Sequence, residues 1–319
     1  MNLRQFVCAA ALATGLLPAA QSQSATFTWP ARTITWIVGF APGGTADVLT
    51  RLAAEGLAQR TGYTVLVENR PGASGAIALQ QAARGSAGEP VLITVPGPLL
   101  YPSPQPTIGA GLAPVGLMAE GPMVVVGPRG GPADMRAVLE AARNAPESWS
   151  YASSGTGTSQ HLAGELINLQ AGTRMLHVPY KGGGQAVTDV VGAQIPLAIL
   201  GPTPVMPHIR SGALTAYAVT TAYRLDSLPE TPTLREAGLP DYDASQWFAV
   251  AASPNVKADT AAQLNALLAE VYRAPAFQQA LEFAGMRAGQ GSAQDLVEFV
   301  RSDTERWDRV ATEVGLELQ

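Results

Sequence analysis

Three short loops of the sequence carry the residue types that bind small anions. Residues 40–45 (Phe-Ala-Pro-Gly-Gly-Thr) follow an apolar run and precede apolar residues at helical spacing. Residues 153–159 repeat this order, and residues 179–184 (Pro-Tyr-Lys-Gly-Gly-Gly) form a third loop. Helix starts carry unpaired backbone N–H groups and the positive end of the helix dipole. The sequence therefore predicts an anion site at the carboxyl ends of strands.

Each loop also has a purely structural interpretation. Gly43 and Gly44 either supply turn geometry alone or let the backbone approach a ligand. Asp47 either interacts with the dipole of its own helix or contacts the ligand. Lys181 is either a solvated surface charge or part of the site. The residues by themselves leave these alternatives open.

No cofactor motif is complete. Residues 155–157 (Gly-Thr-Gly) open like a dinucleotide-binding fingerprint, but Gln160 occupies the third glycine position. A phosphate-binding Gly-Lys-Ser/Thr sequence is absent. The only cysteine, Cys8, lies in the N-terminal apolar run, which leaves the mature chain without a thiol. We therefore expect no cofactor.

Catalytic and metal-binding groups are also poorly represented. The serines at positions 153 and 154 do not lie in a Gly-x-Ser-x-Gly elbow. His161, His177 and His208 lack the spacing of metal ligands, so we interpret them as structural. We expect neither an enzyme nor a metal site. A hydrolase that uses Ser154 and His161 is the remaining enzymatic alternative.

Composition and the N-terminus predict an exported protein with a large core. Apolar residues make up 47% of the 319 residues and charged residues 14%. The net charge is −5, and lysine occurs only at Lys181 and Lys257, so nucleic acid is a poor partner. Arg4, the apolar run of residues 6–20 and a short polar stretch predict a signal peptide over residues 1–24. We therefore expect a periplasmic location.

Short β-branched runs alternate with helical patterns along the chain, which predicts an α/β protein with largely parallel sheets. We expect Ser74 to cap a helix that runs toward Arg84, and residues 96–114 to form a surface loop. A composition shift near residue 123 indicates a boundary between lobes. The expected strands are residues 34–40, 64–68, 91–95, 123–126, 149–152, 176–178, 195–200, 214–220 and 247–252, and two expected amphipathic helices are residues 260–272 and 292–310.

Characteristic sequence blocks extend over nearly the whole chain that follows the signal peptide. They are residues 29–30 (WP), 40–47 (FAPGGTAD), 68–75 (ENRPGASG), 151–157 (YASSGTG), 161–165 (HLAGE), 177–182 (HVPYKG), 207–209 (PHI), 218–220 (AVT) and 229–238 (PETPTLREAG). In this order the blocks closely resemble the Bug family, the extracytoplasmic receptors associated with tripartite tricarboxylate transporters.

The resemblance implies a type II periplasmic-binding-protein fold with two α/β lobes, two crossing strands and a ligand cleft. It places residues 25–122 and 248–319 in lobe 1 and residues 123–247 in lobe 2. It implies a monomer that binds a small organic acid for membrane transporter subunits, with a ligand-binding module for a sensor kinase as the alternative. The ligand-binding residues it implies are Phe40, Ala41, Pro42, Gly43, Gly44, Thr45, Asp47, Ser153, Ser154, Gly155, Thr156, Gly157, Thr158, Ser159, His161, Pro179, Tyr180, Lys181, Gly182 and Leu200.

Two positions depart from the family pattern on one side of the expected pocket. Pro196 stands where relatives usually have an acidic residue, and Leu200 where they often place a second aspartate that faces the cleft. An apolar floor leaves a ligand ammonium group without a counter-ion, and burial of an unpaired charge is costly. We therefore expect weak binding of acidic amino acids.

Overall fold

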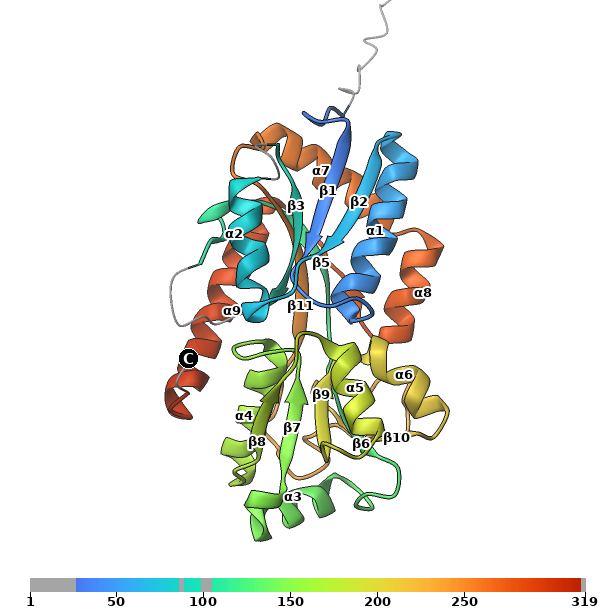
Figure 1. Ribbon diagram of the computed structural model, residues 1–319, viewed down its shortest axis with the longest axis vertical. Helices are drawn as coiled ribbons and strands as arrows, with labels where there is room; N and C mark the ends of the chain where they lie inside the picture. Colours follow the sequence, from blue (N-terminus) through green and yellow to red (C-terminus); the bar gives the residue numbers. More distant parts are fainter. Residues whose placement is uncertain (1–26, 86–88, 99–104, 317–319) are drawn as a thin grey trace, which may run out of the picture.

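Two α/β lobes, each built on its own sheet, make up the protein (Figure 1). The structure is a computed structural model that describes residues 27–85, 89–98 and 105–316. The expected signal peptide lies outside these residues, so its prediction stays a prediction. Within the described ranges, none of the helices combines the length and the apolar character that crossing a membrane requires.

The sheet of the first lobe has the strand order β12-β5-β11-β3-β1-β2, with β4 paired to β5. Strand β1 is parallel to β2 and β3, whereas β11 is antiparallel to both β3 and β5. The sheet is therefore mixed and not largely parallel as expected, because β5 and β11 connect the two lobes. The bounds are β1 (Thr33–Val38), β2 (Thr64–Asn69), β3 (Leu92–Gly97), β4 (Thr107–Ile108), β5 (Gly111–Gly121), β11 (Gln246–Ala252) and β12 (Arg287–Ala288).

Helices cover both faces of this sheet, because side chains along a strand alternate between its faces. Ile34, Trp36 and Val38 of β1 join a core cluster with α1, α7 and α8, whereas Ile37 joins a second cluster with α2 and part of α9. The lobe is thus a three-layer sandwich. The helices are α1 (Thr45–Thr61), α2 (Ala76–Arg84), α7 (Ala258–Tyr272), α8 (Pro275–Ala284) and α9 (Ala293–Glu313).

The second lobe repeats this plan with the strand order β10-β6-β9-β7-β8. Helices α3 and α4 pack on one face of the sheet, and α5 and α6 pack on the other. Strand β7 is parallel to β8 and β9, so α4 and α5 both start at the edge that faces the first lobe (Figure 1). The bounds are β6 (Val124–Pro128), β7 (Ser150–Ser153), β8 (Leu176–Pro179), β9 (Leu197–Leu200), β10 (Leu214–Val219), α3 (Met135–Asn144), α4 (Ser159–Ala171), α5 (Gly183–Val191) and α6 (Pro202–Arg210).

Two neighbouring crossings join the lobes. The first leads from β5 into β6 through Met123, and the second leads from the segment after β10 into β11. They are held together where the Met123 N–H donates to Thr220 Oγ1 at 2.9 Å and the Ala244 N–H donates to the Thr220 carbonyl at 2.9 Å. The predicted fold, two lobes joined by two crossing strands, is confirmed by the structural neighbours described below.

Helix α9 contacts both lobes. Leu296 packs in a cluster of the first lobe, whereas Trp307 and Ala311 pack with Tyr151 and Leu162 in the core of the second. In Figure 1 the helix accordingly runs down alongside both sheets and ends beside α4. The lobe boundaries expected from the sequence stay a prediction, but this helix adds a third connection between the two halves.

The sequence located nine of the strands to within a few residues and missed other features. Ser74 does not cap α2: the helix begins after Gly75, and Ser74 sits in a short 3-10 turn with a φ of 50°. Residues 96–114 are not wholly loop, because β4 and the start of β5 lie within them. Helices α6 and α8 were not expected. Pro207 lies inside α6, where proline is disfavoured, whereas Pro275 stands at the first position of α8, where proline is tolerated.

Replacement of Trp307 by alanine tests the packing of α9 on the second lobe. Trp307 is fully buried, so Trp307→Ala should lower the free energy of unfolding by about 3–5 kcal/mol. Urea denaturation of the purified protein measures the change. The matched control is Glu305→Ala on the exposed side of the same helix, which should change it by less than about 0.5 kcal/mol. Equal stability of the two variants would contradict the packing described.

Candidate functional site

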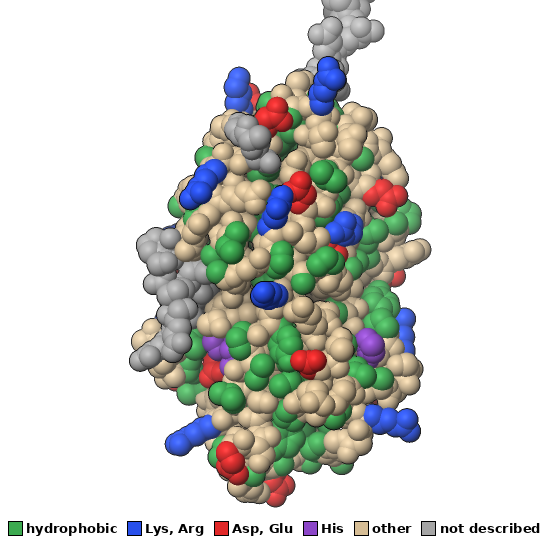
Figure 2. Space-filling view, in the orientation of Figure 1, with side chains coloured by type: hydrophobic (Ala, Val, Ile, Leu, Met, Phe, Trp, Pro, Cys, Tyr) green, Lys and Arg blue, Asp and Glu red, His purple; other side chains and the backbone are tan. Residues whose placement is uncertain are grey.

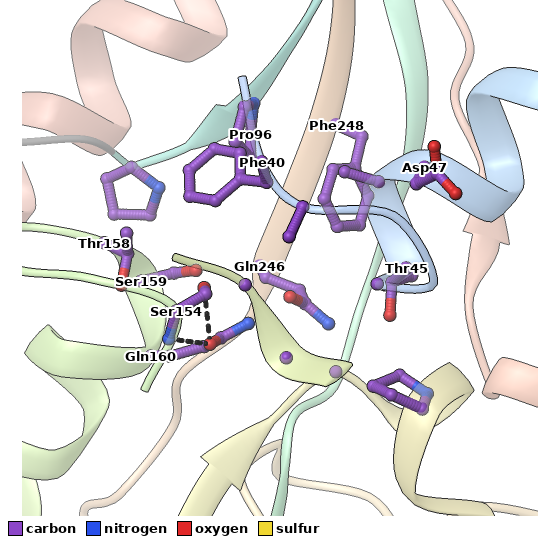
Figure 3. Close-up of a pocket in the computed structure, with 18 residues that line it drawn as sticks. Phe40, Thr45, Asp47, Pro96, Ser154, Thr158, Ser159, Gln160, Gln246 and Phe248 are labelled. Carbon is purple, nitrogen blue, oxygen red and sulfur yellow. Dashed lines mark hydrogen bonds between the residues drawn. The ribbon is translucent and has the colours of Figure 1, made fainter. Parts of the chain in front are cut away.

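A cavity lies between the lobes, where the predicted loops meet (Figure 3). It contains about 530 Å³ that protein atoms do not fill, part of which is open to solvent. Both lobes and the crossing strand β11 contribute to its wall. The wall residues that the sequence predicted are Phe40, Ala41, Gly44, Thr45, Asp47, Ser154, Thr158, Ser159 and Gly182, and those it did not predict are Ala46, Pro96, Pro98, Gln160, Gly183, Gly201, Pro204, Gln246 and Phe248.

The remaining predicted residues lie around this cavity and not in its wall. Five of them line a neighbouring pocket that shares Phe40 and Ser154 with the cavity: Gly155, Thr156, Pro179, Tyr180 and Lys181. The others are Pro42, Gly43, Ser153, Gly157, His161 and the fully buried Leu200, which packs in the core of the second lobe. The wall position beside β9 is therefore taken by Gly201.

Four helices begin at the cavity wall. Their N-cap residues are Gly44 for α1, Thr158 for α4, Gly182 for α5 and Gly201 for α6. Only α4 has a side-chain cap, in which Thr158 Oγ1 accepts from the His161 N–H; the other three helices have none. Unpaired first-turn N–H groups thus converge on one space, which makes it electropositive. Helix α6 contributes its dipole but few N–H groups, because Pro202 and Pro204 have none.

Asp47 is the only ionisable residue among the described residues of the wall. Its carboxylate accepts hydrogen bonds from the Gly43 N–H at 3.0 Å, from Arg51 Nε at 3.0 Å and from Asn69 Nδ2 at 2.8 Å. Burial raises the pKa of Asp47, but these hydrogen bonds and the Arg51 charge outweigh it and leave the pKa below its usual value. The carboxylate therefore fixes the loop before α1, and its negative charge is already neutralised by Arg51.

Thr45, the first residue of α1, presents an unpaired hydroxyl. The side chain is 5% exposed, and its Oγ1 has no hydrogen-bond partner among the described residues. Gly201 of the other lobe approaches so closely that an added Cβ would lie 2.4 Å from this oxygen. Because a buried hydroxyl without a partner is destabilising, Thr45 Oγ1 is a donor that a ligand can satisfy.

The two lobes touch each other around the cavity. The Ala41 N–H of the first lobe donates to the carbonyl of Lys181 in the second at 3.0 Å. An added Cβ on Gly182 would lie 3.0 Å from the Cβ of Ala41, and one on Gly155 would lie 2.6 Å from Ser74 Oγ. Glycine at these positions therefore allows the backbones of the two lobes to come into contact.

A serine nucleophile is not assembled at this site. Ser154 Oγ donates to Gln160 Oε1 at 2.7 Å and not to His161, the partner that a hydrolase would require. Ser153 Oγ lies 2.6 Å from His177 Nε2, but Ser153 is fully buried. Burial also lowers the pKa of His177 to about 3, which makes it a poor general base.

His161 and His177 stack beneath the loop of residues 153–159, with ring centroids 3.8 Å apart. His161 Nδ1 accepts from the Gly157 N–H at 3.0 Å, and His177 Nε2 contacts Ser153 Oγ. Burial lowers the pKa of His161 to about 4, and burial together with the adjacent His161 lowers that of His177 to about 3. The rings are therefore neutral supports of the loop, and within the described ranges no group of three ligating side chains could hold a metal.

Two lobes, two crossing strands and an electropositive cavity between them define a solute-binding receptor. The model of the tripartite tricarboxylate transporter family receptor, TctC, matches residues 49–316. BugT from Bordetella pertussis is 32% identical over 300 residues, or 92% of each chain. The chain belongs to this TctC/Bug family, whose members are receptors and not enzymes, as the sequence blocks predicted.

Solved structures of relatives have the same fold. The periplasmic binding protein BugD matches with a TM-score of 0.84 at 28% identity, over 91% of this chain and 100% of BugD. Rpa4515 from R. palustris, solved with adipate, matches with a TM-score of 0.83 at 30% identity, over 90% of this chain and 99% of its own. The fold predicted from the sequence is thereby confirmed.

The neutral histidine pair should make stability depend on pH. The unfolded chain binds a proton on each histidine below pH 6.5, whereas the folded chain does so only near pH 4 for His161 and pH 3 for His177. The free energy of unfolding should therefore fall as the pH drops from about 6.5, by about 2 kcal/mol per histidine at pH 5. Urea denaturation at pH 7 and pH 5 measures this loss, and His177→Gln should remove about half of it. An unfolding free energy that is equal at both pH values would contradict the burial of the pair.

Proposed function

We propose that the protein is an extracytoplasmic receptor that captures a small organic carboxylate between its lobes and delivers it to a tripartite tricarboxylate transporter. The observation that carries the proposal is the convergence of four helix N-termini on one cavity whose described wall contains no lysine or arginine. An anion is the ligand that such a wall stabilises, and a carboxylate accepts several hydrogen bonds at once. The likeness to Rpa4515, solved with adipate, supports the same class.

Hydrogen bonds from helix termini are strong enough for this role without a salt bridge. The dipole of one helix N-terminus stabilises a nearby anion by about 0.3–1 kcal/mol, and by up to about 2 kcal/mol where the site is partly buried. Each hydrogen bond to a charged group contributes about 1.5–3 kcal/mol. Three hydrogen bonds, one from each of two termini and one from the Thr45 hydroxyl, give about 4.5–9 kcal/mol, and the two dipoles add about 0.6–4 kcal/mol. This range includes the roughly 8 kcal/mol that a micromolar dissociation constant requires.

Closure of the lobes around the ligand completes the proposal. Helix α1 belongs to the first lobe and helices α4, α5 and α6 to the second, so a carboxylate between them has partners on both sides. To shift such an equilibrium from 1:99 to 99:1 a ligand needs about 5.5 kcal/mol of differential affinity, which contacts available only in the closed form provide. The hydrogen bond from the Ala41 N–H to the Lys181 carbonyl joins the two lobes and so stabilises the closed state.

Export and delivery complete the role. Residues 1–24 have the composition of a signal peptide, and the family description names a tripartite transporter. Deletion of the gene, followed by measurement of carboxylate uptake and of the transcriptional response to the same carboxylate, distinguishes a transporter receptor from a sensor module. Loss of uptake alone supports a receptor that serves a transporter. Loss of the transcriptional response alone would instead show a ligand-binding module that serves a sensor kinase.

A thermal-shift screen of about a hundred organic acids tests the receptor function directly. A ligand at 100 times its dissociation constant stabilises the folded protein by about 2.7 kcal/mol, which raises the melting temperature measurably. We expect several carboxylates to do so. Uncharged analogues, such as the methyl esters of the same acids, are the control and should not. A screen in which no carboxylate stabilises the protein would overturn the proposed function.

Removal of the unpaired hydroxyl at Thr45 should lower the affinity for the ligand without lowering the stability of the folded protein. Thr45→Val replaces a buried, unpartnered hydroxyl by a methyl group, so stability should stay equal or rise. The dissociation constant for the tightest carboxylate of the screen should increase at least 10-fold, measured by isothermal titration calorimetry. Thr45→Ser keeps the hydroxyl and should retain affinity within about 3-fold. Unchanged affinity in Thr45→Val would show that Thr45 does not contact the ligand.

Acidic amino acids should bind weakly. The cavity has no free carboxylate among its described residues, because Asp47 is engaged by Arg51 and Asn69, so a ligand ammonium group would be buried without a counter-ion. We expect aspartate and glutamate to bind at least 10-fold more weakly than succinate and glutarate, which lack the amino group. Calorimetry on the four compounds measures this ratio, and tight binding of aspartate or glutamate would refute the expectation.

A further inference from the structure

Two glutamine side chains in the cavity wall have orientations that their hydrogen bonds fix. Gln160 Oε1 accepts from both the N–H and the hydroxyl of Ser154, at 2.8 and 2.7 Å (Figure 3). If the carboxamide were flipped, its NH₂ group would face the Ser154 N–H, donor against donor. The Nε2 end of Gln160 is therefore the end that remains available to the cavity.

The carboxamide of Gln246 has the opposite orientation, because it is held through its Nε2 and not through its Oε1. It begins strand β11 and is 2% exposed, and its Nε2 donates to the carbonyl of Pro122 at 2.9 Å. A flipped carboxamide would place its oxygen against that carbonyl, acceptor against acceptor. The Oε1 end of Gln246 is therefore the free end, and in Figure 3 it is turned toward the side of the cavity on which Gln160 lies.

The two free ends form a donor and an acceptor in one wall. Among the described residues none accepts a hydrogen bond from Gln160 Nε2, and none donates to Gln246 Oε1. Neither side chain has a formal charge. Phe40, Pro96 and Phe248 form an apolar part of the same wall, so these two atoms have few alternative partners there.

We propose that Gln160 and Gln246 are specificity-determining residues that recognise a neutral group on the carboxylate ligand, either a hydroxyl or a carboxamide. Such a group accepts from Gln160 Nε2 and donates to Gln246 Oε1 at the same time. A second carboxylate only accepts, so its oxygens would repel Gln246 Oε1, and an alkyl group would leave both amide ends unpaired. This inference rests on the carboxylate function proposed above, and it narrows the ligand to a hydroxy- or carbamoyl-carboxylate.

Ligand series of matched length test the inference on the unmodified protein. One series is hexanoate, 6-hydroxyhexanoate, adipate and the monoamide of adipate, and the other is butyrate, 4-hydroxybutyrate, succinate and the monoamide of succinate. We expect the hydroxyl or amide compound of at least one series to bind 10-fold or more tightly than its alkyl and dicarboxylate counterparts. If a dicarboxylate binds as tightly as the hydroxyl and amide compounds in both series, the inference fails while the carboxylate function stands. If none of the eight compounds binds, the inference fails, and the screen of organic acids decides whether the carboxylate function fails with it.

A reversal of the donor at residue 160 tests the role of that side chain. In Gln160→Glu one carboxylate oxygen still accepts from Ser154, but the other presents an acceptor where Nε2 was. Affinity for 6-hydroxyhexanoate, or for the tightest hydroxyl or amide compound, should fall at least 10-fold. The matched control, Gln170→Glu, lies exposed near the other end of α4 and should bind as the unmodified protein does. Equal affinity in Gln160→Glu would overturn the assignment of Gln160.

If Gln160→Glu does not fold, Ser154→Ala provides a second test of the role of Gln160. This variant removes one of the two donors that orient the Gln160 carboxamide, without a new charge. Because Ser154 acts by positioning Gln160, the ratio of affinities between the hydroxyl and alkyl compounds should fall at least 3-fold, whatever the change in affinity for the alkyl compound. A uniform loss for both compounds, or an unchanged ratio, would show that the orientation of Gln160 does not determine specificity.

Discussion

The structure depends on the unpaired N–H groups of helices that start at a single cavity. Each lobe places strands with their carboxyl ends toward the other lobe, so the helices that follow those strands begin at the interface (Figure 1). Three of these helices have no side-chain cap, and Thr45 in the first turn of α1 has a buried hydroxyl without a partner. In α1 and α5 the donors that capping residues normally satisfy are therefore available to a ligand.

Under the proposed function, this arrangement explains how a receptor with few cations binds an anion. Lysine occurs twice in the whole chain, and on the face shown in Figure 2 the charged side chains are scattered. Backbone dipoles are fixed in direction by the fold and lose no side-chain entropy when a ligand arrives. An anion held in this way also needs no buried salt bridge to the protein, whose desolvation penalty can exceed its gain. In the inference drawn above, the neutral side chains of Gln160 and Gln246 then distinguish one organic acid from another.

Support for the loops comes from groups that do not face the ligand. Asp47 ties Gly43, Arg51 and Asn69 together behind the loop before α1. In the other lobe the stacked rings of His161 and His177 hold Gly157 and Ser153 from beneath. Both devices keep backbone N–H groups in place when the ligand is absent, which reduces the entropy that binding must overcome.

Much of the site was determined by local sequence. The glycine loops after β1 and β7 can be located from the sequence, because apolar residues recur at helical spacing directly after each loop. Glycine at residue 43 also suits the φ of 85° that this position adopts. Strand positions followed from β-branched runs between turn residues. The ordered blocks from residue 29 to residue 238 identified the family. These signals lie within a few residues of the feature that they predict.

Only the tertiary structure decided which side chains share the cavity. Pro96, Gln246 and Phe248 enter the wall because β3 and β11 pair next to β1, and Gly201 enters because β9 lies beside β7. The sequence placed Leu200 at the ligand, whereas the structure buries it in the core and turns the next residue toward Thr45. Alternate residues of a strand face opposite sides, so a shift of one position changes a wall residue into a core residue. Contacts between segments some 160 residues apart, such as Thr45 with Gly201, leave no local pattern in the sequence.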